Sequence, residues 1–203
     1  MCNEHCNEDM MFRPRVGEKI PSYSLKAFHN EEISSINIAD YKDKWLVLFF
    51  YPADFTFICP TELEEMADLY NEFKKLGAEV VSVSTDTVFV HKAWHDTSEA
   101  IKKIKFPMAS DPSGDFSSMF DVLIEEGDDA GLAVRASIII DPKGIIRAIE
   151  TNDNSIGRNA KELFRKLQAA KFVYEHGGKE VCPANWEPGK DTLTPGLGLV
   201  GKI

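Results

Sequence analysis

The sequence predicts an α/β domain in which helices flank a central mixed sheet. Three segments lead to this prediction: an apolar run at residues 45–51, a helical pattern at residues 60–77, and a strand-like alternation at residues 79–84. Strand, helix and strand in this order form a βαβ unit with parallel strands and a right-handed crossover. We expect residues 1–11 to be a flexible tail and residues 12–203 to form one domain, which suits the length of the chain.

The first predicted strand is the run at residues 45–51, which is uninterrupted by polar side chains and rich in aromatic ones. Such a short apolar run is typical of a strand that is buried on both faces. Apolar residues then recur at spacings of three and four, on one face of a helix: Leu63, Met66, Ala67, Tyr70 and Phe73. Pro60 suits the first turn of this helix, and Gly77 suits its end.

Further elements follow towards the C-terminus. A second helix is predicted from about residue 87 to residue 101, and a β-hairpin at residues 137–149 turns at Pro142–Gly144. Asn159, with Glu162 three residues later, is typical of a helix start, and this helix is expected to stop at Gly177. The chain after Cys182 is rich in proline and glycine, and we expect it to be irregular.

The composition narrows the classes of function. The net charge of −10 argues against binding to nucleic acid and against docking on anionic membranes, because both need clustered Lys and Arg. The longest apolar run has seven residues, whereas a membrane-spanning helix needs about 20. Residues 1–9 are polar and do not resemble a signal peptide, so we expect a cytoplasmic protein.

Cys59 is the strongest candidate for a reactive residue among the four cysteines. It lies between the buried strand and the following helix, where unpaired N–H groups and the helix dipole favour a thiolate, the nucleophilic form. Thr56 is one turn away and can donate to the sulfur or to a bound oxygen, and Pro52 can shape the loop and exclude water. The alternative from position alone is a buried core cysteine that acts as a small apolar side chain.

The motif around Cys59 resembles that of the peroxiredoxins. Pro52-x-x-x-Thr56-x-x-Cys59 matches their active-site pattern, and the segment from Asp54 to Glu62 resembles the typical 2-Cys subgroup. Four more segments match in order, at residues 84–95, 131–142, 181–186 and 199–203. The last of them resembles the bacterial alkyl hydroperoxide reductase peroxidase subunits. The resemblance covers about residues 12–203 and implies a thioredoxin-like fold.

The resemblance also implies a mechanism. Cys59 is expected to attack a peroxide and become a sulfenic acid, with Thr56 bonding the peroxide, Arg135 stabilising charge, and Pro52 shielding the site. Cys182 from a partner subunit is expected to form a disulfide with Cys59. The resemblance further implies a homodimer that assembles into a decameric ring, a flavoprotein disulfide reductase or thioredoxin-like protein as reductant, and no metal or organic cofactor.

Some of these assignments depend on the resemblance alone. Arg135 in isolation is more typical of a strand-edge surface residue, and Cys182 in isolation is a thiol in an irregular tail. Glu62 and Arg158 match family positions that form a charge network around the active-site arginine, although a helix-start Glu and a loop Arg are usually solvated. A ring-forming chaperone or a redox-signalling scaffold is the alternative function that the family allows.

Three other patterns are weaker. Cys2, His5 and Cys6 form an incomplete metal-ligand set on the predicted tail, where a redox or metal role is the third alternative. His91 and His95 have the spacing of a zinc pair, but the glutamate of the usual motif is missing, so packing is favoured. Residues 196–201 match GxGxxG without the following helix that a dinucleotide site needs.

Two departures from the family pattern concern sensitivity to peroxide. Peroxide-sensitive members of the 2-Cys class carry a GGLG insertion and a C-terminal Tyr-Phe extension, and neither is present in this sequence. We therefore expect Cys59 to be slow to over-oxidise to sulfinic acid. The loop at residues 125–131, before Arg135, is longer than the bacterial subgroup leads us to expect.

Overall fold

The computed structural model describes residues 12–202, so the tail predicted at residues 1–11 lies outside the described residues. Within the described range, the strands form one mixed sheet of seven strands in the order β2-β1-β5-β4-β3-β6-β7. The strands are β1 (Ser24–His29), β2 (Glu32–Asn37), β3 (Trp45–Phe50), β4 (Ala78–Ser84), β5 (Met108–Ser110), β6 (Arg135–Ile140) and β7 (Ile146–Asn152). The helices are α1 (Cys59–Lys75), α2 (Val88–Thr97), α3 (Asp115–Met119) and α4 (Ala160–Glu175).

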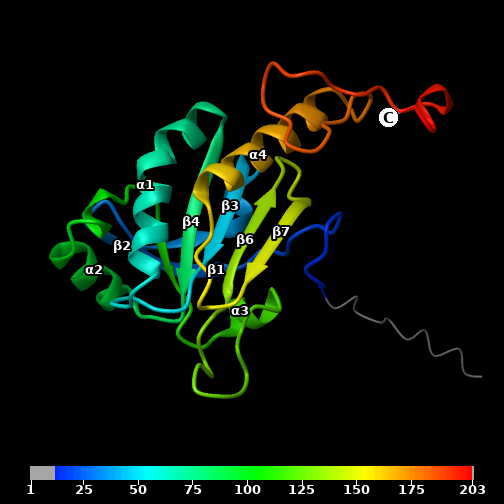
Figure 1. Ribbon diagram of the computed structural model, residues 1–203. Helices are drawn as coiled ribbons and strands as arrows, with labels where there is room; N and C mark the ends of the chain where they lie inside the picture. The colour runs from blue at the N-terminus through cyan, green and yellow to red at the C-terminus, as the bar shows by residue number, and fades with distance from the viewer. Residues whose placement is uncertain (1–11, 203) are drawn as a thin grey trace, which may run out of the picture.

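The predicted βαβ unit is confirmed. β3 pairs in parallel with β4, and α1 connects them (Figure 1). On its other side β3 pairs antiparallel with β6, with Phe50 opposite Ala136. β3 is therefore a central strand, which explains why its sequence is apolar at every position.

The sheet divides the core into two layers, and the side chains of β3 alternate between them. Trp45, Val47 and Phe49 face the layer that α1, α2 and α4 cover. Leu46, Leu48 and Phe50 face the opposite layer, which includes α3. This alternation follows from the two-residue period of a strand. Figure 1 shows α1 and α4 on the same face of the sheet.

The second helix is shorter than predicted. α2 ends at Thr97, and a short 3₁₀ turn at Ile101–Lys103 takes the place of its expected last turn. Ser98 has an extended backbone, while its N–H still closes the last helical turn on the Trp94 carbonyl. Strands β1, β2 and β5 were not predicted, because the exposed β2 and the short β5 give no clear apolar pattern.

The hairpin and the last helix are confirmed. β6 and β7 pair antiparallel, and Asp141 Oδ1 accepts from the backbone N–H groups of Lys143 and Ile145 in the turn. Asn159 caps α4 by accepting from the N–H of Glu162 at 3.0 Å. The Glu162 carboxylate contacts Arg165 instead of reaching back to the cap.

The C-terminal segment after α4 is irregular, as predicted, and is anchored to α4 by a few contacts. The Trp186 ring packs on Phe172 with centroids 4.9 Å apart, and its carbonyl accepts from Arg165 Nη1 at 3.0 Å. In Figure 1 the last residues extend away from the sheet, beyond the end of α4. Nowhere in residues 12–202 is a helix both long and apolar enough to cross a membrane.

Candidate active site

Cys59 is the first residue of α1, at the end of the loop that leaves β3. Its side chain is fully buried. In the β3–β6 pair, Phe50 at the end of β3 lies opposite Ala136. Arg135 at the start of β6 therefore lies at the same end of the strands as the loop that follows β3. The sheet register thus brings together two residues that lie 76 positions apart in the sequence.

The Arg135 guanidinium contacts the Cys59 sulfur directly. Its Nη1 atom is 3.4 Å from Sγ and also donates to Glu62 Oε2 at 2.7 Å. Its Nε atom donates to the backbone carbonyl of Asn154 at 2.9 Å. Arg135 is 3% exposed, so the prediction that it lies at the site is favoured over a strand-edge surface arginine.

Glu62 and Arg158 form the buried network that the resemblance implies. Arg158 donates its backbone N–H and its Nε to Glu62 Oε1, at 2.7 and 2.9 Å, and its Nη2 to Oε2 at 3.0 Å. Its guanidinium lies over the Phe49 ring, 3.5 Å from the centroid. Burial alone would raise the pKa of Glu62, but the hydrogen bonds and charge of Arg158, with Arg135, hold that pKa below its ordinary value.

The charges in this buried cluster are unequal. Arg135 and Arg158 contribute two positive charges, and Glu62 contributes one negative charge. The two guanidinium groups therefore share one carboxylate, and Arg135 Nη1 places a positive charge beside the Cys59 sulfur. A positive charge in this position stabilises negative charge that develops next to the sulfur during a reaction.

The donor that contacts the Cys59 sulfur differs from the one expected from its position at the start of a helix. The N–H groups of Thr61 and Glu62 are already bonded to the carbonyl of Ile58, and Pro60 has no N–H group. Among the described residues, no backbone N–H donates to the Cys59 sulfur, and Arg135 is its donor. The unpaired N–H groups expected from position alone are therefore not the donors, and this role falls to Arg135 of β6, as the resemblance implies.

Thr56 and Pro52 lie in the loop before Cys59. Thr56 is half-buried, and its hydroxyl donates to the Ala53 carbonyl at 2.9 Å rather than to the sulfur. A hydroxyl has one hydrogen, so in this arrangement Thr56 Oγ1 can only accept a hydrogen bond from a bound molecule. Pro52 is buried, in keeping with a role in excluding water.

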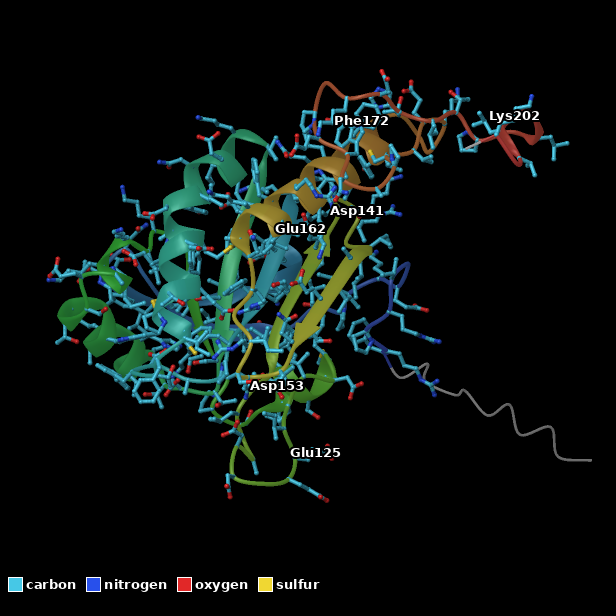
Figure 2. All side chains as sticks on the ribbon, in the orientation of Figure 1. Glu125, Asp141, Asp153, Glu162, Phe172 and Lys202 are labelled. Atoms are coloured by element: carbon cyan, nitrogen blue, oxygen red, sulfur yellow. The ribbon has the colours of Figure 1, made fainter. Side chains whose placement is uncertain are left out.

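Cys182 lies far from Cys59 in the same chain. Its sulfur lies 3.8 Å from the carbonyl oxygen of Ala169 on α4. Ala169 lies nine residues after Ala160, the first residue of α4, which corresponds to about 14 Å along the helix. The N-terminus of α4 is the end that approaches α1, since the Ala160 N–H lies 3.5 Å from Glu65 Oε2. In Figure 2, Asp153, next to the Asn154 that bonds Arg135, lies well apart from Phe172, which packs on Trp186 of the C-terminal segment.

Cys182 lines an open groove of about 1000 Å³, whose cationic side chains at Arg147, Arg165 and Lys166 are each paired with a carboxylate. Burial raises the pKa of the Cys182 thiol, and the Arg165 guanidinium offsets only part of this rise. The Cys182 thiol is therefore expected to stay protonated at neutral pH.

His91 and His95 are not arranged as a zinc pair. His91 is fully buried, and its Nδ1 lies 2.7 Å from Asp54 Oδ2. His95 lies instead near Glu31 and Asp96, but the Lys92 ammonium bonds Asp96 at 2.7 Å and already supplies a cation there. The tail residues Cys2, His5 and Cys6 lie outside the described residues.

Sequence reasoning missed two groups that contact the site. The Asn154 carbonyl holds Arg135, and the Asn154 side chain in turn donates to Asp129 Oδ2 at 3.2 Å. Asp54 bonds both Tyr51 and His91 beneath the loop that carries Thr56. Asp54 belongs to the segment that resembles the family, but its bond to His91, 37 residues away, and the contact of Asn154 with Arg135, 19 residues away, are not marked by a local pattern.

The fold and this site define a class of protein, the peroxiredoxins, whose chemistry is that of a cysteine thiol. Residues 16–149 match the family model described as "AhpC/TSA family", and residues 169–196 match "C-terminal domain of 1-Cys peroxiredoxin". The first range includes Cys59 and Arg135, and the second includes Cys182. The chain therefore belongs to the AhpC/TSA family of peroxiredoxins, which are oxidoreductases.

Individual relatives agree with this assignment. The chain is 52% identical over 188 residues to alkyl hydroperoxide reductase C of Salmonella typhimurium, covering 93% of this chain and 98% of the relative. The crystal structure of Enterococcus faecalis AhpC matches with a TM-score of 0.77 and 48% identity, over 83% of this chain and 98% of that one. A reduced 2-Cys peroxiredoxin of Plasmodium vivax matches with a TM-score of 0.83 and 32% identity, over 89% and 93%.

Proposed function

We propose that the protein is a two-cysteine peroxidase that reduces hydrogen peroxide and small organic hydroperoxides through Cys59. The observation that carries this proposal is the contact of 3.4 Å between Arg135 Nη1 and the buried Cys59 sulfur, within a cluster in which two guanidinium groups share one carboxylate. The name of the Salmonella relative, alkyl hydroperoxide reductase C, supports organic hydroperoxides as a substrate class.

In the first step the Cys59 thiolate attacks one peroxide oxygen. An S–O bond forms as the O–O bond breaks, so the sulfur loses two electrons and becomes a sulfenic acid. The other oxygen leaves with the electron pair and takes up a proton, giving water or an alcohol. Arg135 stabilises the charge that develops on this leaving oxygen. Thr56 Oγ1 accepts a hydrogen bond from the hydroperoxide O–H, and the buried Pro52 keeps water away from the sulfenate.

In the second step the Cys182 thiol attacks the Cys59 sulfur of a partner subunit. The S–S bond forms, and the sulfenic oxygen leaves with the thiol proton as water. The position of Cys182, beside Ala169 at the far end of the molecule, supports a partner as its source, because a disulfide needs Cα atoms within about 7 Å. The first turn of α1 must unwind to present Cys59.

A dithiol reductant then reopens the disulfide by thiol–disulfide exchange. We propose a flavoprotein disulfide reductase or a thioredoxin-like protein in this role, and a homodimer assembled into a decameric ring as the active form. The cytoplasm is the proposed compartment, since it supplies such reductants and keeps thiols reduced. The enzyme names of the relatives favour a peroxidase over a ring-forming chaperone or signalling scaffold.

Single-turnover measurements on three forms of the protein test this proposal. The reduced wild-type protein should consume one equivalent of peroxide and form a disulfide-linked dimer. Cys182→Ser should consume peroxide at the wild-type rate but stop at the sulfenic acid, which a dimedone-type probe traps. Cys59→Ser should consume no peroxide above the uncatalysed level. Unchanged consumption by Cys59→Ser would refute the assignment of the nucleophile.

A further inference from the structure

The loop between β3 and α1 holds an unfavourable backbone conformation. Phe55, one residue before Thr56, has φ of +55°, in the left-handed region that residues other than glycine rarely adopt. Phe55 is 56% exposed. Its ring packs on the Trp94 ring of α2, with the two ring centroids 5.8 Å apart. Such a conformation persists only where neighbouring contacts hold it in place.

Asp54 supplies these contacts from the adjacent position. Its Oδ1 accepts from the Tyr51 hydroxyl at 2.7 Å, and its Oδ2 lies 2.7 Å from His91 Nδ1 on α2. Its backbone N–H donates to Asp86 Oδ2 at 2.8 Å. The side chains of Asp54 and His91 are completely buried. One residue thus ties the loop to Tyr51 directly after β3, to α2 and to the segment after β4.

The protonation of the Asp54–His91 pair follows from its partners. His91 Nε2 lies 3.2 Å from the carbonyl of Ala109, which can only accept, so Nε2 carries a hydrogen. A second proton lies between Nδ1 and the Asp54 carboxylate. Wherever that proton resides, the pair has no net charge, which is what a completely buried site requires.

Asp86, which accepts from the Asp54 backbone N–H, is itself bonded to two strands of the sheet. Its Oδ2 accepts from the Ser84 hydroxyl at 2.9 Å, at the end of β4. Its backbone carbonyl accepts from the Ser110 hydroxyl at 2.7 Å, at the end of β5. The attachment of Asp54 therefore rests on rigid elements rather than on other loop residues.

We propose that Asp54 and His91 form a latch that holds this loop closed and so positions Thr56 and Cys59 for attack on peroxide. Both are positioning residues, because neither contacts the sulfur. The inference rests on the proposed function, in which the loop is closed for the peroxide step and the first turn of α1 must unwind for the disulfide step. The latch therefore acts in opposite directions on the two steps.

His91→Leu tests the latch, because it removes the contacts of His91 with Asp54 and with the Ala109 carbonyl. The Asp54 carboxylate then keeps only the Tyr51 hydroxyl as a side-chain partner. We expect the rate of the peroxide step to fall by about tenfold to a hundredfold, the cost of a displaced reacting group. The rate of disulfide formation after one turnover should rise. His91→Asn, whose Nδ2 can donate to Asp54, should restore most of the peroxide rate. Damage to the fold in general would slow both steps.

Asp54→Leu provides a second route, should His91→Leu fail to fold, because leucine has a similar shape and can neither accept from Tyr51 nor bond His91. The double variant Asp54→Leu/His91→Leu should be no slower than the slower single variant, because both changes open the same latch. A wild-type peroxide rate in His91→Leu or Asp54→Leu, or equal slowing of both steps, would overturn the proposal. Failure of the proposed function would appear instead as peroxide consumption by Cys59→Ser, so the two failures are distinguishable.

Discussion

The surroundings of Cys59 and Cys182 differ in burial, in charge and in regular structure. Cys59 is fully buried at the start of α1 and contacts the Arg135 guanidinium. Cys182 is half-buried in an irregular segment, where its sulfur lies 3.8 Å from a backbone carbonyl and its pKa is raised by burial. The comparison teaches that a contacting guanidinium, rather than exposure, decides which thiol is activated. The half-buried Cys182 thiol, whose pKa is raised, is expected to be the protonated one.

The largest expected effect comes from breaking the charge network on the Cys59 side. Glu62→Gln leaves the guanidinium groups of Arg135 and Arg158 without a buried counter-charge, and we expect it to lower the free energy of unfolding by about 3–5 kcal/mol. Urea unfolding measures this loss. Glu162→Gln is the matched control, since it removes an exposed carboxylate from the first turn of α4 and should cost less than about 1 kcal/mol. Equal losses in both variants would contradict the network.

The same carboxylate gives a dependence of stability on pH. Because the folded pKa of Glu62 lies below its unfolded value, its contribution is complete above the unfolded value of about 4.3 and is lost as the pH falls through the folded pKa. Wild-type stability should therefore decline in this acid range more steeply than that of Glu62→Gln. Parallel declines in urea unfolding at several pH values would show that Glu62 is not the group responsible.

The next largest expected effect comes from removing the arginine beside each thiol, Arg135 beside Cys59 and Arg165 beside Cys182. Arg135→Met should slow the reaction of Cys59 with peroxide by about 10²–10³-fold, the usual cost of removing a donor to developing charge. Arg165→Met removes the arginine beside Cys182 and should leave the peroxide step unchanged. Stopped-flow single turnovers separate the two outcomes. Similar rates in both variants would mean that charge near Cys59 has no special role.

The smallest expected effect lies on the Cys182 side. With Cys2, Cys6 and Cys59 replaced by serine, alkylation of Cys182 should reach half its maximal rate above pH of about 8.5, because its pKa is raised. Arg165→Gln should move this midpoint further upward, since Arg165 is the group that lowers that pKa. A midpoint below the ordinary thiol value would contradict the contrast between the two sites.

Local patterns in the sequence predicted the elements that position Cys59. The continuous apolar run of β3, the helical spacing of α1 and the Asn159 cap are features of neighbouring residues, and the structure confirms all three. Contacts between distant residues could not be predicted in this way. Glu62 and Arg158 lie 96 positions apart, and only the resemblance brought them together.

The remaining differences between the predicted and the observed structure also arise from contacts or backbone conformations that the apolar pattern does not reveal. Three contacts depend on how the loop folds back on itself and on α2: the hydrogen bond that Thr56 donates to the Ala53 carbonyl, the N–H groups that the Ile58 carbonyl accepts from, and the Asp54–His91 pair. The early end of α2 depends on the extended backbone at Ser98, which the apolar pattern does not reveal. Residues 24–37 form a hairpin whose outer strand is mostly exposed and so lacks a clear apolar pattern.

One mixing experiment tests most directly the claim that the two thiols act from different subunits. In a background without Cys2 and Cys6, Cys59→Ser and Cys182→Ser chains are mixed, allowed to exchange subunits and treated with one equivalent of peroxide. We predict a disulfide-linked dimer of one chain of each kind, with the Cys59 and Cys182 peptides joined in mass spectra. Neither variant alone should form this disulfide. A mixture that forms no such link, while the parent protein joins Cys59 to Cys182 within one chain, would contradict the account.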